Sequence, residues 1–321
     1  MVYTIIDVGM EQSMCVLKLP QKLDFDALFD CISNNHLSST DTNVIDFSAV
    51  EFADPTGIAP LAAVARKWLG DGLELTFQPP SPTTGAFKYL QRVDFFRKFH
   101  VFEDEKFRRH NPQGNFCPLQ EIAYDSPTEN IATKLAGALT GNNPTFIHAR
   151  SELYNCLYES MNNIKDHARL GNVAGYSLVQ NYKLDYNNKE YVFTTADAGR
   201  GISESLRDNS ELKIDNETTA LNLACQPSIS GSPGIEEYYG YPRNMGEGLT
   251  NIDRVVKLAK GYFRLISGSA ERIRREDKVE CRSCQYPWQG TIVIVKLTMA
   301  GMQQYLNEPK AIQQEDEVRF D

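Results

Sequence analysis

The chain has 321 residues and a mass of 36.2 kDa, a length that suggests two domains of about 150 residues, each able to bury its own core. Apolar residues make up 41% and charged residues 23% of the sequence, which excludes a disulfide-stapled miniprotein, a fibrous chain and a disordered chain. The net charge of −9 repels phosphate backbones, so nucleic acid is a poor default partner.

The sequence gives no sign of membrane insertion or export. No stretch approaches about 18 consecutive apolar residues, and the start, MVYTIIDVGMEQ, lacks the basic residues and apolar run of a signal peptide. The seven cysteines are odd in number and scattered, as expected for reduced thiols. We therefore expect a cytoplasmic protein without a membrane partner.

Residues 1–105 predict a first domain of strands and amphipathic helices. Residues 44–47 are a compact β-prone run, and the Asp54-Pro-Thr-Gly sequence behind it has the turn and N-cap chemistry that opens a helix. A second strand is predicted at residues 73–77 and a further helix over residues 86–96. This region therefore predicts a unit in which strand, turn and helix alternate.

The composition changes after the first domain. Residues 106–127 are charged, rich in turn residues and poor in apolar ones, which predicts a linker. Residues 128–302 predict a second domain, and residues 303–321 a polar tail. The expected fold class is α/β (α+β) with two domains.

The second domain is expected to contain one long helix, several apolar strands and a polar insertion. In chain order these are a helix at 145–168, strands at 175–182 and 191–196, a polar segment at 202–245, a helix at 249–259, and strands at 262–267 and 291–297. An irregular segment of that length inside a compact domain is usually functional or mobile, which favours a lid.

The long helix places a carboxylate and an amide on one face. Glu159 and Asn163 are four residues apart, so they lie one above the other. Asp166 and His167 follow in the next turn. Helices often present such residues to solvent, so this spacing gains meaning only from the segments that follow.

Asp197 follows the apolar strand at 191–196 directly and precedes Gly199 and Gly201. Glycines at this point let the backbone approach a flat ligand, while the acid accepts a hydrogen bond from an exocyclic amine. The same pattern also occurs in ordinary turns.

Two more glycine segments complete the set. Gly246, Gly248 and Leu249 open a helix, whose unpaired amides and positive dipole end suit phosphate oxygens. Gly290 and Thr291 begin the last apolar strand, where a hydroxyl can assist a neighbouring acid. Each segment alone is also explained as ordinary helix or strand sequence.

In this order and spacing, the four segments resemble the N box, the two glycine boxes and the terminal Gly-Thr of the GHKL nucleotide-binding superfamily. That superfamily includes DNA gyrase B subunits, heat-shock chaperones, mismatch-repair proteins and sensor kinases. The resemblance covers residues 128–300 and implies a Bergerat α/β sandwich that binds ATP and Mg²⁺. It implies that Asn163 is the metal ligand and that Asp197 accepts a hydrogen bond from the adenine amino group.

Six further residues match nucleotide contacts of the superfamily. They are Gly199 and Gly201 on the adenine side, Gly246, Gly248 and Leu249 on the phosphate side, and Thr291 as support for Asp197. The sequence contains no glycine-rich P-loop. Arg200 and Arg243 are therefore the candidates for phosphate contact, with surface arginines as the favoured interpretation.

The sequence does not decide between the ATP-hydrolysing members of the superfamily and its protein kinases. Glu159 matches the general base that orients the attacking water in the hydrolysing members, and Asp166 also resembles that branch. His167, by contrast, is similar to the anti-sigma-factor serine kinases.

The first domain resembles STAS domains, the fold of anti-sigma-factor antagonists, which implies a mixed sheet with helices. Residues 44–58 match their strand-loop-helix signature and residues 89–99 their closing helix. In the antagonists, a hydroxyl at the position of Thr56 is phosphorylated by a GHKL kinase, which makes Thr56 a candidate phosphoacceptor. Pro55 departs from the usual small hydroxyl residue, and the alternative is that Thr56 only caps the helix.

Cys281 and Cys284 have the spacing of a pair of zinc ligands. A structural zinc site needs four ligands, and no second pair or histidine cluster stands nearby in the sequence. We therefore expect plain thiols in a β-hairpin.

These patterns predict a regulatory switch that binds Mg·ATP and hydrolyses it slowly, if at all. Its nucleotide state would order residues 202–245 and so control contact with a protein partner or a second copy of the chain. One alternative is an anti-sigma-type protein serine/threonine kinase acting on Thr56 or on a partner's STAS domain. Another is a binding module in which the nucleotide is structural.

Overall fold

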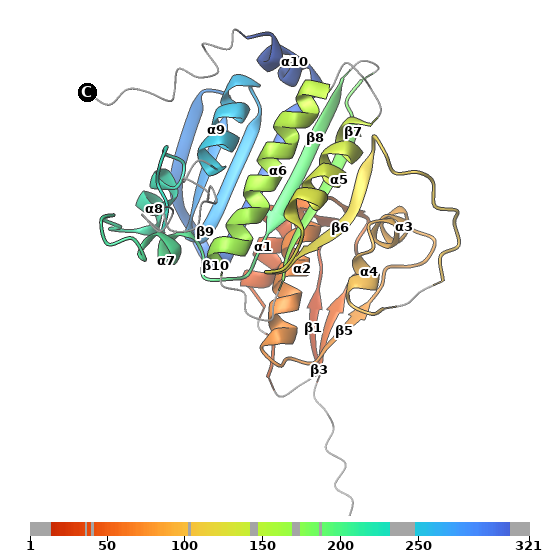
Figure 1. The fold of residues 1–321 in the computed structure, drawn as a ribbon. Helices are drawn as coiled ribbons and strands as arrows, with labels where there is room; N and C mark the ends of the chain where they lie inside the picture. The colour runs from red at the N-terminus through yellow and green to blue at the C-terminus, as the bar shows by residue number, and fades with distance from the viewer. Residues whose placement is uncertain are drawn as a thin grey trace, which may run out of the picture.

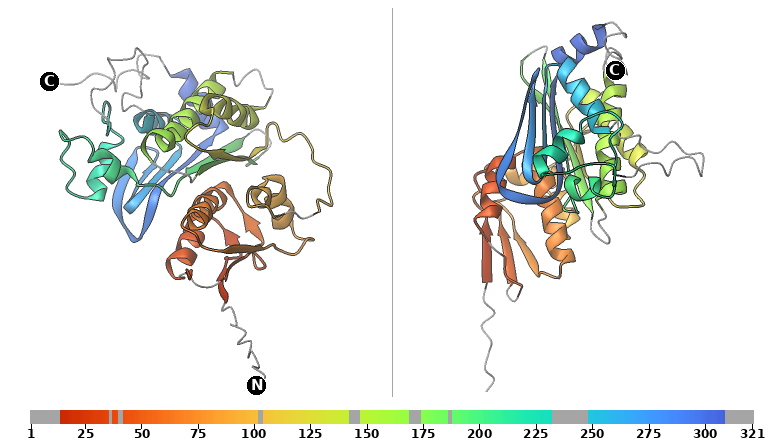
Figure 2. Two further views of the ribbon diagram at one scale, coloured as in Figure 1. Left: turned by 60° about the horizontal axis from the view of Figure 1, so that its bottom comes forward. Right: turned by 90° about the vertical axis from the view of Figure 1, so that its left-hand side faces the viewer.

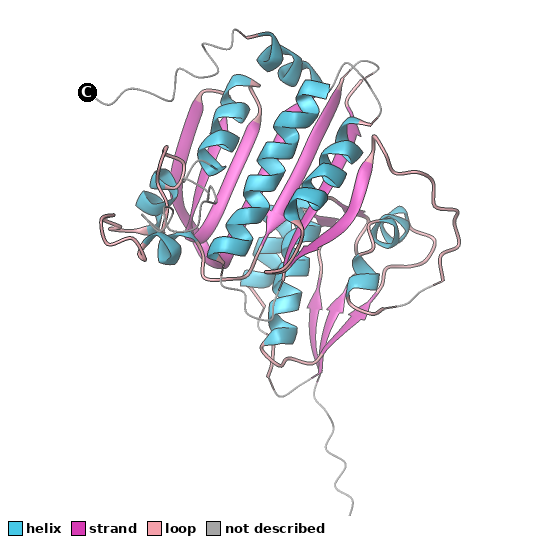
Figure 3. Cartoon of the chain, viewed as in Figure 1, coloured by secondary structure: helices cyan, strands magenta, loops and turns pink. Residues whose placement is uncertain are grey.

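The computed structural model describes residues 14–35, 37–39, 42–101, 104–141, 147–168, 174–185, 188–231 and 248–308. These residues form a mixed α+β protein of helices and several β-sheets (Figure 1 and Figure 3). Among the described helices, none is both long enough and apolar enough to cross a membrane.

The N-terminal part is built around a small parallel sheet. Its elements are β1 (Met14–Lys18), β2 (Lys22–Leu23), α1 (Phe25–Ser33), β3 (Thr42–Asp46), β4 (Phe52–Ala53), α2 (Pro55–Gly70), β5 (Leu75–Gln78), α3 (Gly85–Arg92) and α4 (Phe95–Lys98). The strand order is β1-β3-β5, and β2 pairs separately with β4. All these described pairs are parallel, so the mixed sheet expected here is wrong for them. Helices α1 and α2 provide the crossovers that parallel neighbours require.

Local sequence signals explain where these helices begin and end. Asp54 caps α2 by accepting a hydrogen bond from the Thr56 amide, and Pro55 occupies the first helical turn, as the sequence predicts. The helix predicted over 86–96 is divided into α3 and α4. The division lies at Asp94, whose φ of 60° is left-handed and cannot continue a right-handed helix.

The C-terminal part contains a five-stranded antiparallel sheet. Its elements are β6 (Phe116–Ile122), α5 (Thr128–Thr140), α6 (Ile147–His167), β7 (Gly175–Lys183), β8 (Lys189–Ala196), α7 (Ile202–Leu206), α8 (Glu217–Leu223), α9 (Gly248–Leu258), β9 (Tyr262–Arg275), β10 (Lys278–Thr298) and α10 (Met299–Asn307). The strand order is β6-β7-β8-β10-β9, and every pair is antiparallel.

Three segments differ from the sequence prediction. Strand β6 lies inside the predicted linker at 106–127 and pairs with β7. Strands β9 and β10 are much longer than predicted and form a hairpin. Helix α10 continues to Asn307, into the predicted polar tail, whose residues 309–321 are outside the described chain.

The two faces of the large sheet are covered by different parts of the chain (Figure 2). Helices α5, α6 and α9 cover one face, and the N-terminal part packs on the other, with α2 against β7 and β8. Tyr191 and Phe193 of β8 belong to the core under the helices, whereas Ala196 belongs to the core shared with the N-terminal part. Successive side chains of a strand point to opposite faces of the sheet, so alternate residues of β8 enter different cores.

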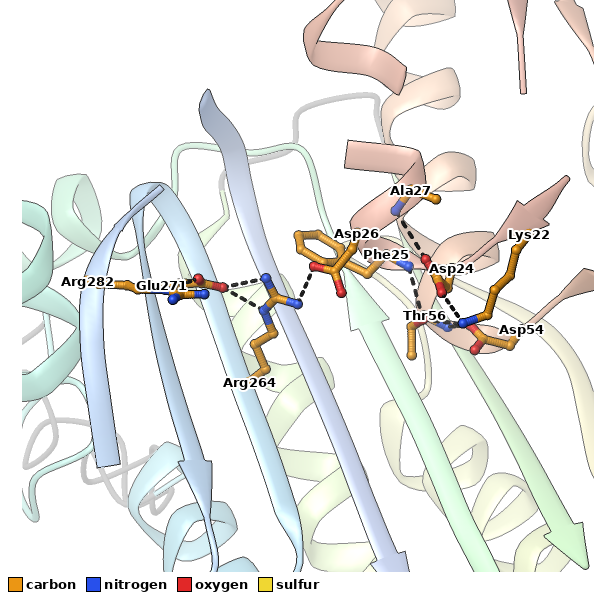
Figure 4. A network of polar contacts seen from close by, with 10 residues as sticks. All are labelled: Lys22, Asp24, Phe25, Asp26, Ala27, Asp54, Thr56, Arg264, Glu271 and Arg282. Atoms are coloured by element: carbon orange, nitrogen blue, oxygen red, sulfur yellow. Dashed lines mark hydrogen bonds and ion pairs between the residues drawn. The ribbon is translucent and has the colours of Figure 1, made fainter. Parts of the chain in front are cut away.

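Polar contacts also join the two parts. The guanidinium of Arg66 on α2 donates to the Tyr176 hydroxyl at 3.0 Å. Arg264 on β9 forms a 2.7 Å ion pair with Asp26 of α1 and also bonds Glu271 in its own hairpin (Figure 4). The N-terminal part is thus attached through α1 and α2 to both β7 and β9.

Candidate functional site

The four predicted nucleotide segments meet at one end of the large sheet. Asn163, Asp197, Gly201 and Thr291 line a cavity of about 30 Å³. Asn163, Gly248 and other residues line a second cavity of about 60 Å³, and Asn163 borders both, so the two adjoin. The fold therefore brings together residues separated by more than a hundred positions in sequence.

Asp197 lies at the end of β8 with only 2% of its surface exposed. Burial raises its pKa to about 7, against the opposing effect of hydrogen bonds from the Gly199 and Thr291 amides. The Gly199 amide donates to Asp197 Oδ1 at 2.8 Å. A buried carboxyl poised near neutrality is a frequent feature of binding and catalytic sites.

The backbone of Asp197 is held by β10. Its amide donates to the Thr291 carbonyl at 2.9 Å, and the indole Nε1 of Trp288 donates to its carbonyl oxygen at 3.0 Å. Thr291 therefore supports the acid through main-chain contacts, whereas the sequence analysis expected its hydroxyl. The contribution of Trp288 was not predicted.

The glycines after Asp197 are required by close packing. A Cβ at Gly199 would overlap the carbonyl oxygen of Ala168 at the end of α6. Gly201 has a φ of 80°, a conformation that side chains other than glycine rarely adopt. The adjoining amide of Ile202 donates to Ser267 Oγ at 2.9 Å, which fixes this turn to β9.

Glu159 of α6 lies beside the first turn of α9. A Cβ placed on Gly248 would come 2.8 Å from Glu159 Oε2, so glycine permits this approach. The carboxylate is thus next to the helix start predicted to receive phosphates. Gly246 lies outside the described residues, and Leu249 lines the larger cavity.

Several buried polar side-chain atoms have no hydrogen-bond partner in the described part of the chain, and one of them, Asn163 Nδ2, belongs to a residue that lines both cavities. They include Asn163 Nδ2 on α6, Ser203 Oγ on α7 and Thr250 Oγ1 on α9. Such atoms are rare in native structures because leaving a buried donor unpaired is costly. Asn163 Nδ2 is therefore a hydrogen-bond donor available to a group that binds in these cavities.

Arg200 differs from the surface arginine that the sequence analysis favoured. Its side chain is 9% exposed and forms a 2.6 Å ion pair with Asp208, with a further bond to Ser205 Oγ. Its charge is therefore already compensated. Arg243 lies outside the described residues, as do the side chains of Asp166 and His167, although α6 includes both.

A buried hydroxyl cluster behind Asp197 was missed from the sequence. Thr195 Oγ1 lies 3.1 Å from Ser160 Oγ on α6 and 3.1 Å from Ser177 Oγ on β7. The available signal was a hydroxyl residue within an apolar strand, two positions before the acid. These bonds anchor α6, which carries Asn163, to the sheet.

Thr56 is buried, with 4% of its surface exposed. Its hydroxyl donates to Asp54 Oδ1 at 2.6 Å and accepts from the Phe25 amide at 3.1 Å (Figure 4). Asp54, not Thr56, caps α2, so the capping alternative is wrong. Phosphorylation of Thr56 would require this region to open and would place a phosphate beside Asp54.

Cys281 and Cys284 lie on β10 within the long hairpin, and neither forms a disulfide. Within the described ranges, no group of three or more His, Cys, Asp or Glu side chains is arranged to hold a metal ion. Burial raises the pKa of the Cys284 thiol to about 11, so without a bound metal this thiol is protonated at neutral pH.

No protein-family model matches the chain. A search of the curated proteins found no relative either. The site is therefore interpreted from its own geometry and chemistry.

Proposed function

We propose that this chain is a regulatory protein that binds Mg·ATP through a GHKL-like domain and that nucleotide binding controls a STAS-like N-terminal domain. The observation that carries the proposal is the convergence of Asn163, Asp197 and Gly248 on two adjoining buried cavities. They come from α6, the end of β8 and the start of α9. Each element contributes the chemical group that one part of a nucleotide requires.

The chemistry of these groups fits the parts of ATP. Asp197 would accept a hydrogen bond from the adenine amino group, with Gly199 and Gly201 allowing the base to approach the backbone. The first turn of α9, beginning at Gly248, offers backbone amides to phosphate oxygens. The amide of Asn163 would supply one oxygen ligand to Mg²⁺, which usually takes its other ligands from phosphates and water.

The size of the cavities favours a switch over a preformed pocket. Volumes of about 30 and 60 Å³ hold water molecules, whereas ligand pockets usually measure about 300–1,000 Å³. Ile202 and Ser205 of α7 line both cavities, and Ile229–Gly231 line the larger one. ATP binding would therefore move α7 and the segment near residue 230, which transmits the nucleotide state to the surface.

Slow hydrolysis would be consistent with the position of Glu159 beside Gly248. A carboxylate next to the phosphates can act as a general base for water, a contribution of about 10²–10⁴-fold. The kinase alternative is less well supported, because the Thr56 hydroxyl is buried and bonded to Asp54.

Isothermal titration calorimetry with Mg·ATP tests the assignment. Asp197→Asn should abolish binding because an amide places a donor against the adenine amino group, whereas the exposed control Asp215→Asn should bind like wild type. Glu159→Gln should retain binding and lose phosphate release. Unchanged affinity in Asp197→Asn would show that the acid does not contact the nucleotide and would refute the site.

The switch itself is tested by native mass spectrometry with and without a nonhydrolysable ATP analogue. We expect the analogue to change the association state or the protease sensitivity of residues 202–231. If saturating nucleotide changes neither, the protein binds ATP without switching.

A further inference from the structure

A third cavity lies away from the proposed nucleotide site and is larger than the two cavities near Asp197. It measures about 450 Å³, within the range of small-molecule pockets. Its walls come from the last residue of α3, residues 109–112 and 115, and the first residues of β6, and none of them lines the cavities near Asp197. We call it the junction pocket because the segment leading into β6 passes α3 there (Figure 1).

The inner walls of the junction pocket are mainly apolar. Pro112, Phe116 and Pro118 contribute a flat ring and two rigid pyrrolidine rings. Proline has no backbone N–H, so these walls offer few hydrogen-bond donors. Such a surface favours a flat apolar body over a polyhydroxylated or peptide ligand.

The ionisable side chains that line the pocket are all of basic residue types. Arg92, Arg109 and His110 line it, and none of its described lining residues is acidic. Arg109 is oriented by Asp94 at 2.7 Å and by Glu105 at 2.8 Å, so its charge is compensated. Arg92 is therefore the arginine at this pocket whose positive charge can act on a bound ligand.

Arg92 has no carboxylate partner among the described residues. Its guanidinium instead lies over the ring of Phe107, 4.8 Å from the ring centre. That contact holds the planar group in place while its N–H donors remain suited to an oxyanion. The chain has a net charge of −9, so an arginine with no described carboxylate partner beside an apolar cavity stands out as a candidate anion contact.

We infer that the junction pocket binds an aromatic monocarboxylate, with the ring on Phe116 and Pro112 and the carboxylate on Arg92. The inference does not depend on the proposed nucleotide function, because the two sites share no residue. A ligand there would touch both α3 of the N-terminal part and β6 of the large sheet.

Fluorescence titration with 1-anilinonaphthalene-8-sulfonate, an aromatic monoanion, tests the inference on the full chain. We expect saturable 1:1 binding that 2-naphthoate displaces at least about tenfold better than uncharged 2-naphthamide, because one charge-assisted hydrogen bond corresponds to about that ratio. Equal displacement by the two competitors, or no saturable binding, would overturn the proposal.

Variants locate the binding. Arg92→Gln should weaken probe binding by about tenfold or more, and Asn115→Trp should block it by filling the cavity from an exposed position. The control Arg108→Gln removes a cation from the same segment outside the pocket and should bind like wild type. An equal loss in Arg92→Gln and Arg108→Gln, or full binding in Asn115→Trp, would place the probe elsewhere and refute the site.

Discussion

The two faces of the five-stranded sheet are both buried but differ in chemistry. Toward the helices, the hydroxyls of Ser177 and Thr195 meet Ser160, close to the acid of Asp197. Toward the N-terminal part, residues such as Leu178 and Ile294 present an apolar surface to α2 and its neighbours. The hydroxyl cluster and Asp197 thus lie on the helix-covered face, and the other face serves docking.

This difference shows why the N-terminal part matters to the candidate site. An antiparallel sheet often leaves one face to water, but here the second face forms a core with the N-terminal part. Trp288 belongs to that shared core, and its indole also holds the carbonyl of Asp197. A residue of the docked face, Trp288, therefore helps to hold Asp197 in the candidate site on the other side of the sheet.

The largest effect is expected from a charge placed on the docked face. Leu178 is fully buried there, so Leu178→Asp should lower the free energy of unfolding by about 3 kcal/mol or more. Urea denaturation measures the loss. The control Leu184→Asp, at a position 51% exposed, should change stability by less than about 0.5 kcal/mol. Similar effects in the two variants would contradict the docked arrangement.

The buried acid on the polar face should cost stability at alkaline pH. Its folded pKa of about 7 lies above the unfolded value of about 3.9, so the folded state binds more protons between these values. Stability contributed by this group is present below pH 4 and is lost as the pH rises to about 7.

Asp197→Asn removes that cost. We expect its unfolding free energy at pH 8 to exceed that of wild type by up to about 4 kcal/mol, with a smaller gain at pH 5. Urea titrations at both pH values check this. Asp215→Asn, whose side chain is 61% exposed, should show no such pH dependence. A pH-independent difference for Asp197→Asn would contradict the raised pKa.

The link between the two faces can be weakened at one hydrogen bond. Trp288→Phe keeps an aromatic ring but leaves the Asp197 carbonyl without the indole donor, so the unfolding free energy should fall by about 1–2 kcal/mol. If the proposed function holds, ATP affinity should fall as well, because Asp197 is less firmly held. Wild-type stability and ATP affinity in this variant would show that the bond does not support the site.

The smallest effect is expected at the exposed ion pair between the two parts. The Asp26 side chain is 74% exposed, and its partner Arg264 keeps Glu271. Asp26→Asn should therefore destabilise the protein by less than about 1 kcal/mol, and the difference should vanish in about 1 M salt. A larger loss that persists in high salt would make this contact more important to docking than its exposure suggests.

Local signals predicted much of the secondary structure but little of its assembly. Asp54 predicted the start of α2, and the apolar run before Asp197 predicted β8. Strand β6 was missed because its seven residues follow a turn-rich segment, and because its pairing with β7 and packing against α5 are contacts between different segments of the chain. The burial of Thr56 was also missed, since it depends on Phe25 and other residues distant in sequence.

The amino-acid order alone predicted the candidate site residues and most of the helices and strands, because caps, turns and apolar spacing act over a few residues. Only the tertiary structure decided what covers each face of the sheet, how much room surrounds Asp197, and which arginines are already neutralised. Those properties arise from contacts between segments far apart in the chain. Burial by such contacts changes a carboxyl's pKa, and close packing of α6, α7 and α9 limits the space left for a ligand.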